Sequence, residues 1–106
     1  MLNSNLPEPE VLKILLEPLL EDFVYWFGRS QTLLETEKIS FLHPQQQSDL
    51  LERVKQAQKE VSTVQMLFRA TGGQVGVETA TLIPWHRLLM ECSQVAMRFR
   101  MEHSAK

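Results

Sequence analysis

Nucleophilic chemistry in this chain would have to centre on Cys92, the only cysteine, with a base beside it. A thiol attacks as the thiolate, and histidine is its usual base. His86 lies six residues earlier, about 240° around a helix at 100° per residue, so the two cannot meet within one helix. Cys92 also falls in the apolar series of its helix, which favours a small core residue. We therefore predict no catalytic residue and no enzyme.

Metal chemistry finds no better support in the sequence. A helical two-metal site needs a glutamate with a histidine three residues later. The residues three before His43, His86 and His103 are serine, isoleucine and arginine. No cluster of cysteine and histidine has the spacing of a zinc site either. We predict no metal ligand and no cofactor.

The third candidate is the glycine-rich segment 72–76, whose backbone N–H groups could bind an anion. It lacks the lysine and the spacing of a P-loop, and a helix cap followed by a turn is the simpler interpretation. A small-ligand or anion-binding regulatory module is thus our alternative function. Its site residues would be Gly72, Gly73, Gln74, Thr79, Trp85 and His86.

The elements that would position these residues are three helices with the same apolar spacing, alternating steps of four and three. Such spacing keeps one seam facing its neighbours and favours coiled-coil-like bundle packing. The series are Leu12, Leu16, Leu19, Phe23, Trp26, Ser30, Leu33; then Leu50, Val54, Ala57, Val61, Val64, Phe68; then Trp85, Leu88, Cys92, Val95, Phe99. The predicted fold is all-α, a compact antiparallel three-helix bundle with long helices.

Prolines and glycines set the expected helix boundaries within a single domain, 1–106. The helices should span about 8–35, 44–70 and 84–101, with a loop at 71–83. Pro44 and Pro84 suit first helical positions, where the missing N–H costs nothing. Pro18 falls inside the first helix, so it predicts a kink there or, as the alternative, two successive helices. The apolar series continues across Pro18, which favours the kink.

Composition and charge exclude several classes of function. The net charge of −2 gives no bulk attraction for nucleic acid. The longest unbroken apolar run, 23–27, is far too short to span a membrane. A single cysteine fits a reducing compartment, so we expect a cytoplasmic protein. The N-terminal end is acidic and the C-terminal end basic, which indicates solvated faces or a charged docking site.

The strongest functional signal is the aromatic stretch at 23–27. Five large apolar residues in succession cover every direction around a helix, whereas a three-helix bundle buries one stripe. A partner-binding or self-associating surface is one interpretation. The other is that the remaining helices and loops wrap this helix completely. If the stretch is a partner-binding or self-associating surface, its partner-binding residues would be Leu20, Val24, Tyr25, Trp26 and Phe27.

Six short motifs are spread over nearly the whole chain: Leu6-Pro7-Glu8-Pro9-Glu10, Leu16-Glu17-Pro18-Leu19-Leu20, Tyr25-Trp26-Phe27, Thr71-Gly72-Gly73-Gln74-Val75-Gly76-Val77, Pro84-Trp85-His86 and Met97-Arg98-Phe99-Arg100. Together they resemble a family of small cyanobacterial proteins known only as a domain of unknown function. The resemblance implies a cyanobacterial cell and carries over no activity, cofactor or site residue. We expect a non-enzymatic interaction or scaffold module that binds a protein partner or itself.

Overall fold

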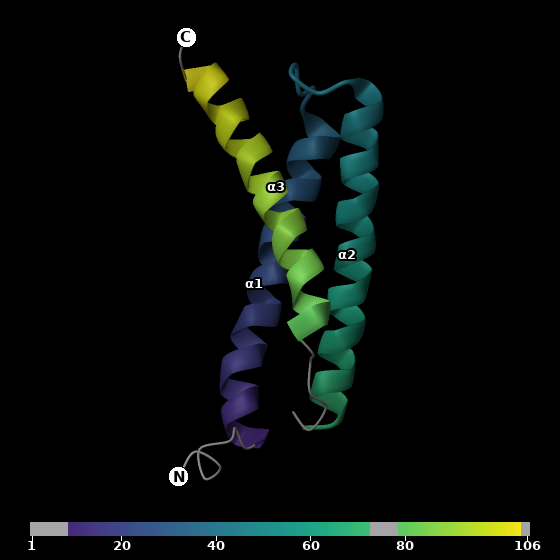
Figure 1. Ribbon diagram of the computed structural model, residues 1–106, viewed down its shortest axis with the longest axis vertical. Helices are drawn as coiled ribbons and strands as arrows, with labels where there is room; N and C mark the ends of the chain where they lie inside the picture. The colour runs from purple at the N-terminus through teal and green to yellow at the C-terminus, as the bar shows by residue number, and fades with distance from the viewer. Residues whose placement is uncertain (1–8, 73–78, 105–106) are drawn as a thin grey trace.

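The fold is an all-α bundle of three long helices that run up, down and up (Figure 1). They are α1 (Pro9–Thr36), α2 (Pro44–Ala70) and α3 (Thr79–Ser104). The computed structural model describes the backbone of residues 9–72 and 79–104 and the side chains of residues 14–72 and 80–104. Within these residues there is no strand, so the predicted fold class is confirmed.

The core is built along α2, whose apolar series packs against α1. Leu50, Val54, Ala57, Val61 and Phe68 are buried, and Val64 is partly buried, so this series faces inward as the spacing predicts. From α1 the buried side chains are Leu20, Phe23, Phe27 and Leu34. Each helix has a continuous row of apolar side chains along one side. The two antiparallel helices pack through these rows because the contact removes the apolar side chains of both from water.

The predicted core series of α1 is wrong in two of its members. Leu19 is 37% exposed and Trp26 is 49% exposed, whereas Leu20 and Phe27 are fully buried. Two rows with the same four-three spacing run side by side on this helix, offset by one residue. The row that faces α2 is buried, and the row that contains Leu19 and Trp26 lies at the outer edge of the α1–α3 contact. Leu12, the first member of the predicted series, lies outside the described side chains.

Both internal prolines lie within continuous helices. α1 runs through Pro18 as one helix, which excludes the alternative of two separate helices. α3 begins at Thr79, so the prediction that it starts at Pro84 is wrong. Pro84 removes only the one hydrogen bond that its N–H would give to the carbonyl of Ala80, near the helix start. Leu82 in the extra turn packs against the core, and this contact stabilises the turn.

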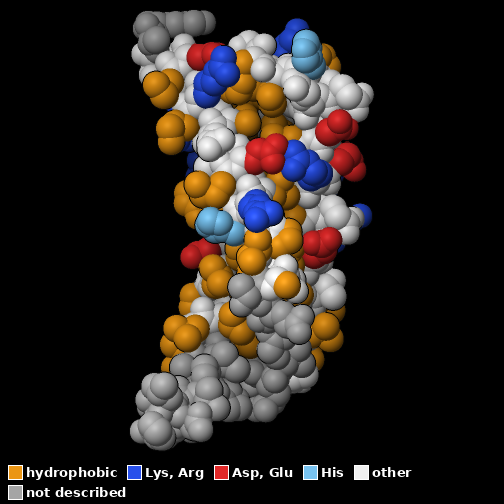
Figure 2. All heavy atoms as spheres, viewed as in Figure 1, with side chains coloured by type: hydrophobic (Ala, Val, Ile, Leu, Met, Phe, Trp, Pro, Cys, Tyr) orange, Lys and Arg blue, Asp and Glu red, His pale blue; other side chains and the backbone are white. Residues whose placement is uncertain are grey.

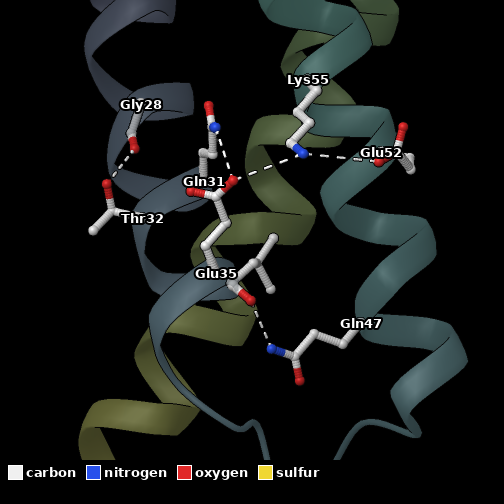
Figure 3. Close-up of polar contacts among 8 residues, drawn as sticks. Gly28, Gln31, Thr32, Glu35, Gln47, Glu52 and Lys55 are labelled. Carbon is white, nitrogen blue, oxygen red and sulfur yellow. Dashed lines mark hydrogen bonds and ion pairs between the residues drawn. The ribbon is translucent and has the colours of Figure 1, made fainter.

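The connector from α1 to α2 is held by the side chain of Gln47 on α2. Its Nε2 donates to the carbonyl oxygens of Leu34 (2.8 Å) and Glu37 (2.7 Å), and its Oε1 accepts from the N–H of Ile39 (3.1 Å). Figure 3 shows Gln47 reaching from α2 to the end of α1. The last carbonyls of a helix have no partner within it, so Gln47 replaces the missing next turn. Ile39, which follows, is thereby held in the core at 1% exposure.

A second link between α1 and α2 lies two turns further along. Lys55 Nζ lies 3.7 Å from Glu35 Oε2 on α1 and 3.9 Å from Glu52 Oε2 on its own helix (Figure 3). Gln31 Nε2 also donates to Glu35 (3.1 Å). All of these side chains reach solvent, so the cluster sets the register of the two helices more than it stabilises them.

The third helix is attached mainly at its N-terminal half. Trp85 is buried, its ring meets Phe23 edge-on at 5.6 Å, and its Nε1 donates to Glu60 Oε1 on α2 (2.9 Å). Two turns later, Arg53 of α2 makes a bidentate pair with Glu91 (3.0 and 2.6 Å). These contacts fix the start and middle of α3 over the α1–α2 pair.

The C-terminal half of α3 diverges from the other two helices, as Figure 1 shows at its yellow end. It rests on the connector, where the Arg98 guanidinium lies 4.2 Å from the centre of the Phe41 ring and Ser40 Oγ donates to Glu102 (3.1 Å). The molecule measures 56 × 26 × 18 Å, with a radius of gyration of 16.9 Å. A compact chain of this length has a radius of about 13 Å. The bundle is therefore elongated rather than compact, because its helices of 26–28 residues rise about 1.5 Å per residue.

Candidate functional site

The aromatic stretch of α1 is divided between core and surface. Phe27, at 0% exposure, and Phe23 are core residues whose rings stack at 5.8 Å. Val24, Tyr25 and Trp26 remain 42–52% exposed. The stretch is therefore not completely wrapped, and partner binding by its exposed residues stays a prediction. Of the five residues predicted to bind a partner, Leu20 and Phe27 are core residues and cannot contribute a surface.

The three exposed members point in different directions. At 100° per residue, Val24 lies on the edge of α1 near α2, Tyr25 points away from the bundle, and Trp26 lies toward α3. The Trp26 and Tyr25 rings meet edge-on at 4.9 Å, and Arg29 Nη1 donates to the Tyr25 hydroxyl (3.0 Å). Trp26 is therefore supported on one side and open to solvent on the other.

Two rows of side chains on α1 and α3 form one continuous surface around Trp26, which we call the α1–α3 face. At 100° per residue each row stays within about 100° of arc on its helix. Its members are Leu15, Leu19, Asp22, Trp26, Arg29 and Leu33 from α1, and Ile83, His86, Met90, Ser93, Met97, Arg100 and Met101 from α3.

This face is unusually apolar for a solvated surface. The exposed fractions of Met90, Met97 and Met101 are 49%, 54% and 64%, and Leu15 is 60% exposed. Figure 2 shows hydrophobic side chains gathered along this edge of the molecule, over the diverging end of α3. Exposed apolar side chains are common singly, but a row of them along two adjacent helices marks an interaction surface.

A groove of about 540 Å³ runs along the upper half of this face, between α1 and α3. Small side chains on both helices, Ser30 on α1 and Ser93 and Ala96 on α3, leave the space open. Trp26 and Met97 are among the side chains that line it. A groove of this shape, apolar and bordered by two helices, suits an apolar side of a third helix.

The charges of the groove are placed at its borders. Arg29, Arg100 and Glu37 line it together with the apolar residues, so two cations and one carboxylate surround an apolar floor. Cys92 is buried in that floor, and its burial raises the pKa of the thiol above its usual value. Raising the pKa suppresses the thiolate, which is the nucleophilic form. The groove is therefore built for contact with an apolar group.

The exposed methionines of α3 are the members of this face that the sequence analysis missed. Met90, Met97 and Met101 recur at steps of seven and four on the side of α3 away from Trp85 and Cys92. That spacing is a detectable second apolar row, and Ile83 extends it by seven residues in the other direction. The buried series of α3 alone gave no reason to look at the opposite side.

Of the six residues predicted for the alternative anion site, the structure describes the side chains or backbone of Gly72, Trp85 and His86. Gly72, at a φ of 65°, closes α2 and donates its N–H to the carbonyl of Arg69 (3.1 Å). Trp85 is buried and its indole N–H donates to Glu60 Oε1 (2.9 Å), while His86 is exposed about 100° further around α3. Ligand binding by Trp85 and His86 stays a prediction. Gly73 and Gln74, with the Thr79 side chain, lie outside the described residues.

Within residues 9–72 and 79–104, no group of three or more histidine, cysteine or carboxylate side chains could hold a metal ion. In the same part of the chain, no helix has both the length and the apolar character needed to cross a bilayer.

Comparison with known proteins gives a family. No curated protein and no solved structure shows significant similarity to the chain. The match to a family model, in contrast, extends over residues 6–101, which includes all of α1 and α2 and nearly all of α3. The chain therefore belongs to the family described as "Protein of unknown function (DUF2605)".

Proposed function

We propose that this protein is a non-enzymatic interaction module that binds a protein through the α1–α3 face. The observation that carries the proposal is Trp26, which is half-exposed and lines an open groove together with the exposed Met97 of α3. Tryptophan is among the residues that most often dominate the energy of an interface. Methionine suits such a surface because its flexible, polarisable side chain adapts to its partner.

The energetic argument is that this face gains from being covered. Trp26, Met90 and Met97 are each about half exposed. Burying the remaining exposed part of each side chain would contribute roughly 1 kcal/mol to the free energy of binding. The core does not need Trp26, because Phe23 and Phe27 supply its aromatic side chains from α1. The binding site thus comprises Trp26 with Leu19, Met90 and Met97, in place of the predicted Leu20 and Phe27.

The test is site-specific photo-crosslinking in cells of the source organism. A benzophenone amino acid at Met97 should give a cross-linked adduct of higher mass on irradiation. The matched control carries the same amino acid at Lys59, which is exposed on α2 away from the α1–α3 face. An adduct from position 97 and none from position 59 supports the proposal.

Substitution of Trp26 provides the second arm of this test. Trp26→Ser should remove the adduct at position 97 while leaving the helix content unchanged, because the side chain contributes little to the core. The same change at Val24, 42% exposed but on the α2 edge, should leave the adduct intact. Absence of any adduct at position 97, or an adduct that is insensitive to Trp26→Ser, would contradict the proposal.

A further inference from the structure

We infer that the partner on the α1–α3 face is a second copy of this chain, which packs antiparallel about a two-fold axis close to Trp26. This inference rests on the proposed function and names its partner. It is carried by the order of residues in the α1 row, by the charges around the groove and by the apolar area of the face.

The α1 row reads nearly the same from both ends. Leu19 stands seven residues before Trp26 and Leu33 seven after it, while Asp22 stands four before and Arg29 three after. Two antiparallel copies centred on Trp26 therefore place Leu19 against Leu33 and Asp22 against Arg29, twice each. Two parallel copies would place Asp22 against Asp22 and Arg29 against Arg29. Charge complementarity selects the antiparallel arrangement.

Both charged groups are available for that contact. Asp22 is exposed and, among the described residues, has no ion-pair partner. Arg29 is exposed as well and uses one N–H for the Tyr25 hydroxyl, at 3.0 Å. A guanidinium has five N–H donors, so a carboxylate of the second copy can be bound without breaking that hydrogen bond. The Tyr25 contact in fact holds Arg29 in place at the border of the face.

The groove fits the segment that this arrangement would bring to it. With the axis near Trp26, the first half of the partner's α1 lies along the groove, which runs from the level of Trp26 to that of Glu37. Residues 14–28 carry no basic side chain, and their part of the α1 row presents Leu15, Leu19 and Asp22. The groove presents Arg29 and Arg100 at its borders, together with Glu37. A helix row of leucines with one aspartate is thus the complementary occupant, and the chain itself supplies one.

The area of the face is of the size that a dimer needs. Its six most exposed apolar side chains are 44–64% exposed: Leu15, Trp26, Ile83, Met90, Met97 and Met101. Together they present on the order of 600 Å², at the upper end of the largest patch on an ordinary monomer. A standard interface buries about 800 Å² on each partner, and the polar residues between these side chains supply the remainder.

The test is a charge exchange read by light scattering over a wide range of protein concentration. The wild-type protein should have twice the 12.3 kDa mass of the chain at high concentration. Asp22→Arg and Arg29→Asp should each raise the dissociation constant by about tenfold or more, because each substitution turns two attractive contacts into repulsive ones. The double variant Asp22→Arg with Arg29→Asp should restore the dimer.

The matched control is Glu21→Arg, which makes the same change in net charge one residue away. Glu21 is exposed but points away from the α1–α3 face, so this variant should dimerise like the wild type. Circular dichroism checks that all variants keep their helix content. Added salt should weaken the wild-type dimer, which gives a reading that needs no substitution.

The outcomes separate this inference from the proposed function. A monomer at every concentration, or a dimer that Asp22→Arg leaves unchanged, or a double variant that stays monomeric would each overturn the antiparallel dimer. If the purified protein is monomeric while position 97 still cross-links to a different protein, the interaction surface stands and the second copy is refuted. If position 97 cross-links to nothing, the surface itself is refuted.

Discussion

Replacing Gln47 by methionine should destabilise the bundle far more than an exposed substitution does. The amide of Gln47 makes three hydrogen bonds to the end of α1 and its connector: from Nε2 to the carbonyls of Leu34 and Glu37, and to Oε1 from the N–H of Ile39. Methionine has a similar length and preserves the aliphatic contacts, but it makes none of these bonds. The variant therefore isolates the polar contribution of one side chain.

The magnitude follows from the environment of each bond. A net hydrogen bond contributes about 0.5–1.5 kcal/mol, and an unpaired buried group costs about 1–3 kcal/mol. The bonds to Leu34 and Ile39 are partly buried, whereas that to Glu37 is exposed and water can replace it. We expect a loss of about 2–3 kcal/mol in the free energy of unfolding, a large share of the 5–15 kcal/mol of a typical domain. The urea midpoint should fall by about 1–2 M.

The assay is urea unfolding followed by circular dichroism at one fixed protein concentration, since association would shift the midpoint. The control is Gln45→Met, because Gln45 makes one exposed hydrogen bond to Asp49 on its own helix (2.8 Å). That variant should lose no more than about 0.5 kcal/mol. If Gln47→Met and Gln45→Met lose the same amount, water replaces the amide of Gln47 and our account of the connector is wrong.

Two further substitutions test the core and the attachment of α3. Phe27→Ala should cost about 3–5 kcal/mol in thermal or urea unfolding, because the ring is fully buried against Phe23, and a loss below 1 kcal/mol would contradict its core position. Arg53→Met should cost less than about 1 kcal/mol at pH 7, since its pair with Glu91 is half exposed. Arg53 lowers the pKa of Glu91 in the folded protein below its ordinary 4.5, so the pair stabilises above that pH and loses its effect as the pH falls through the lower folded value. Urea midpoints of the two proteins should converge as the pH falls below 4.5, and a difference that stays constant as the pH is lowered would refute the electrostatic origin.

Apolar spacing predicts α2 well and α1 less well, for a geometric reason. On α2 the charged and polar residues leave only one row with four-three spacing, so the buried side is unambiguous. On α1 the row containing Leu20 and Phe27 and the row containing Leu19 and Trp26 have the same spacing. Periodicity fixes the angle between residues and not which row faces the neighbour. That choice is made by tertiary packing.

The candidate site was predictable only around the aromatic stretch. Tyr25 and Trp26 stand out because five large apolar residues in succession cannot all be buried on one side of a helix. The half of the site on α3 depends on how α1 and α3 lie against each other. Trp26 on α1 and Leu88 on α3 are 62 residues apart in the sequence. Gln47 gives no signal in the sequence, since its partners are backbone groups of Leu34, Glu37 and Ile39.

The elongated shape of the bundle has a consequence for how its mass is measured. A radius of gyration of 16.9 Å is that of a compact chain of about 210 residues, roughly twice the length of this one. A single copy should therefore leave a gel-filtration column near the position of a globular dimer, and its elution volume alone would imitate self-association. Scattered intensity depends on mass and not on shape, so it distinguishes one rod-like molecule from two associated ones.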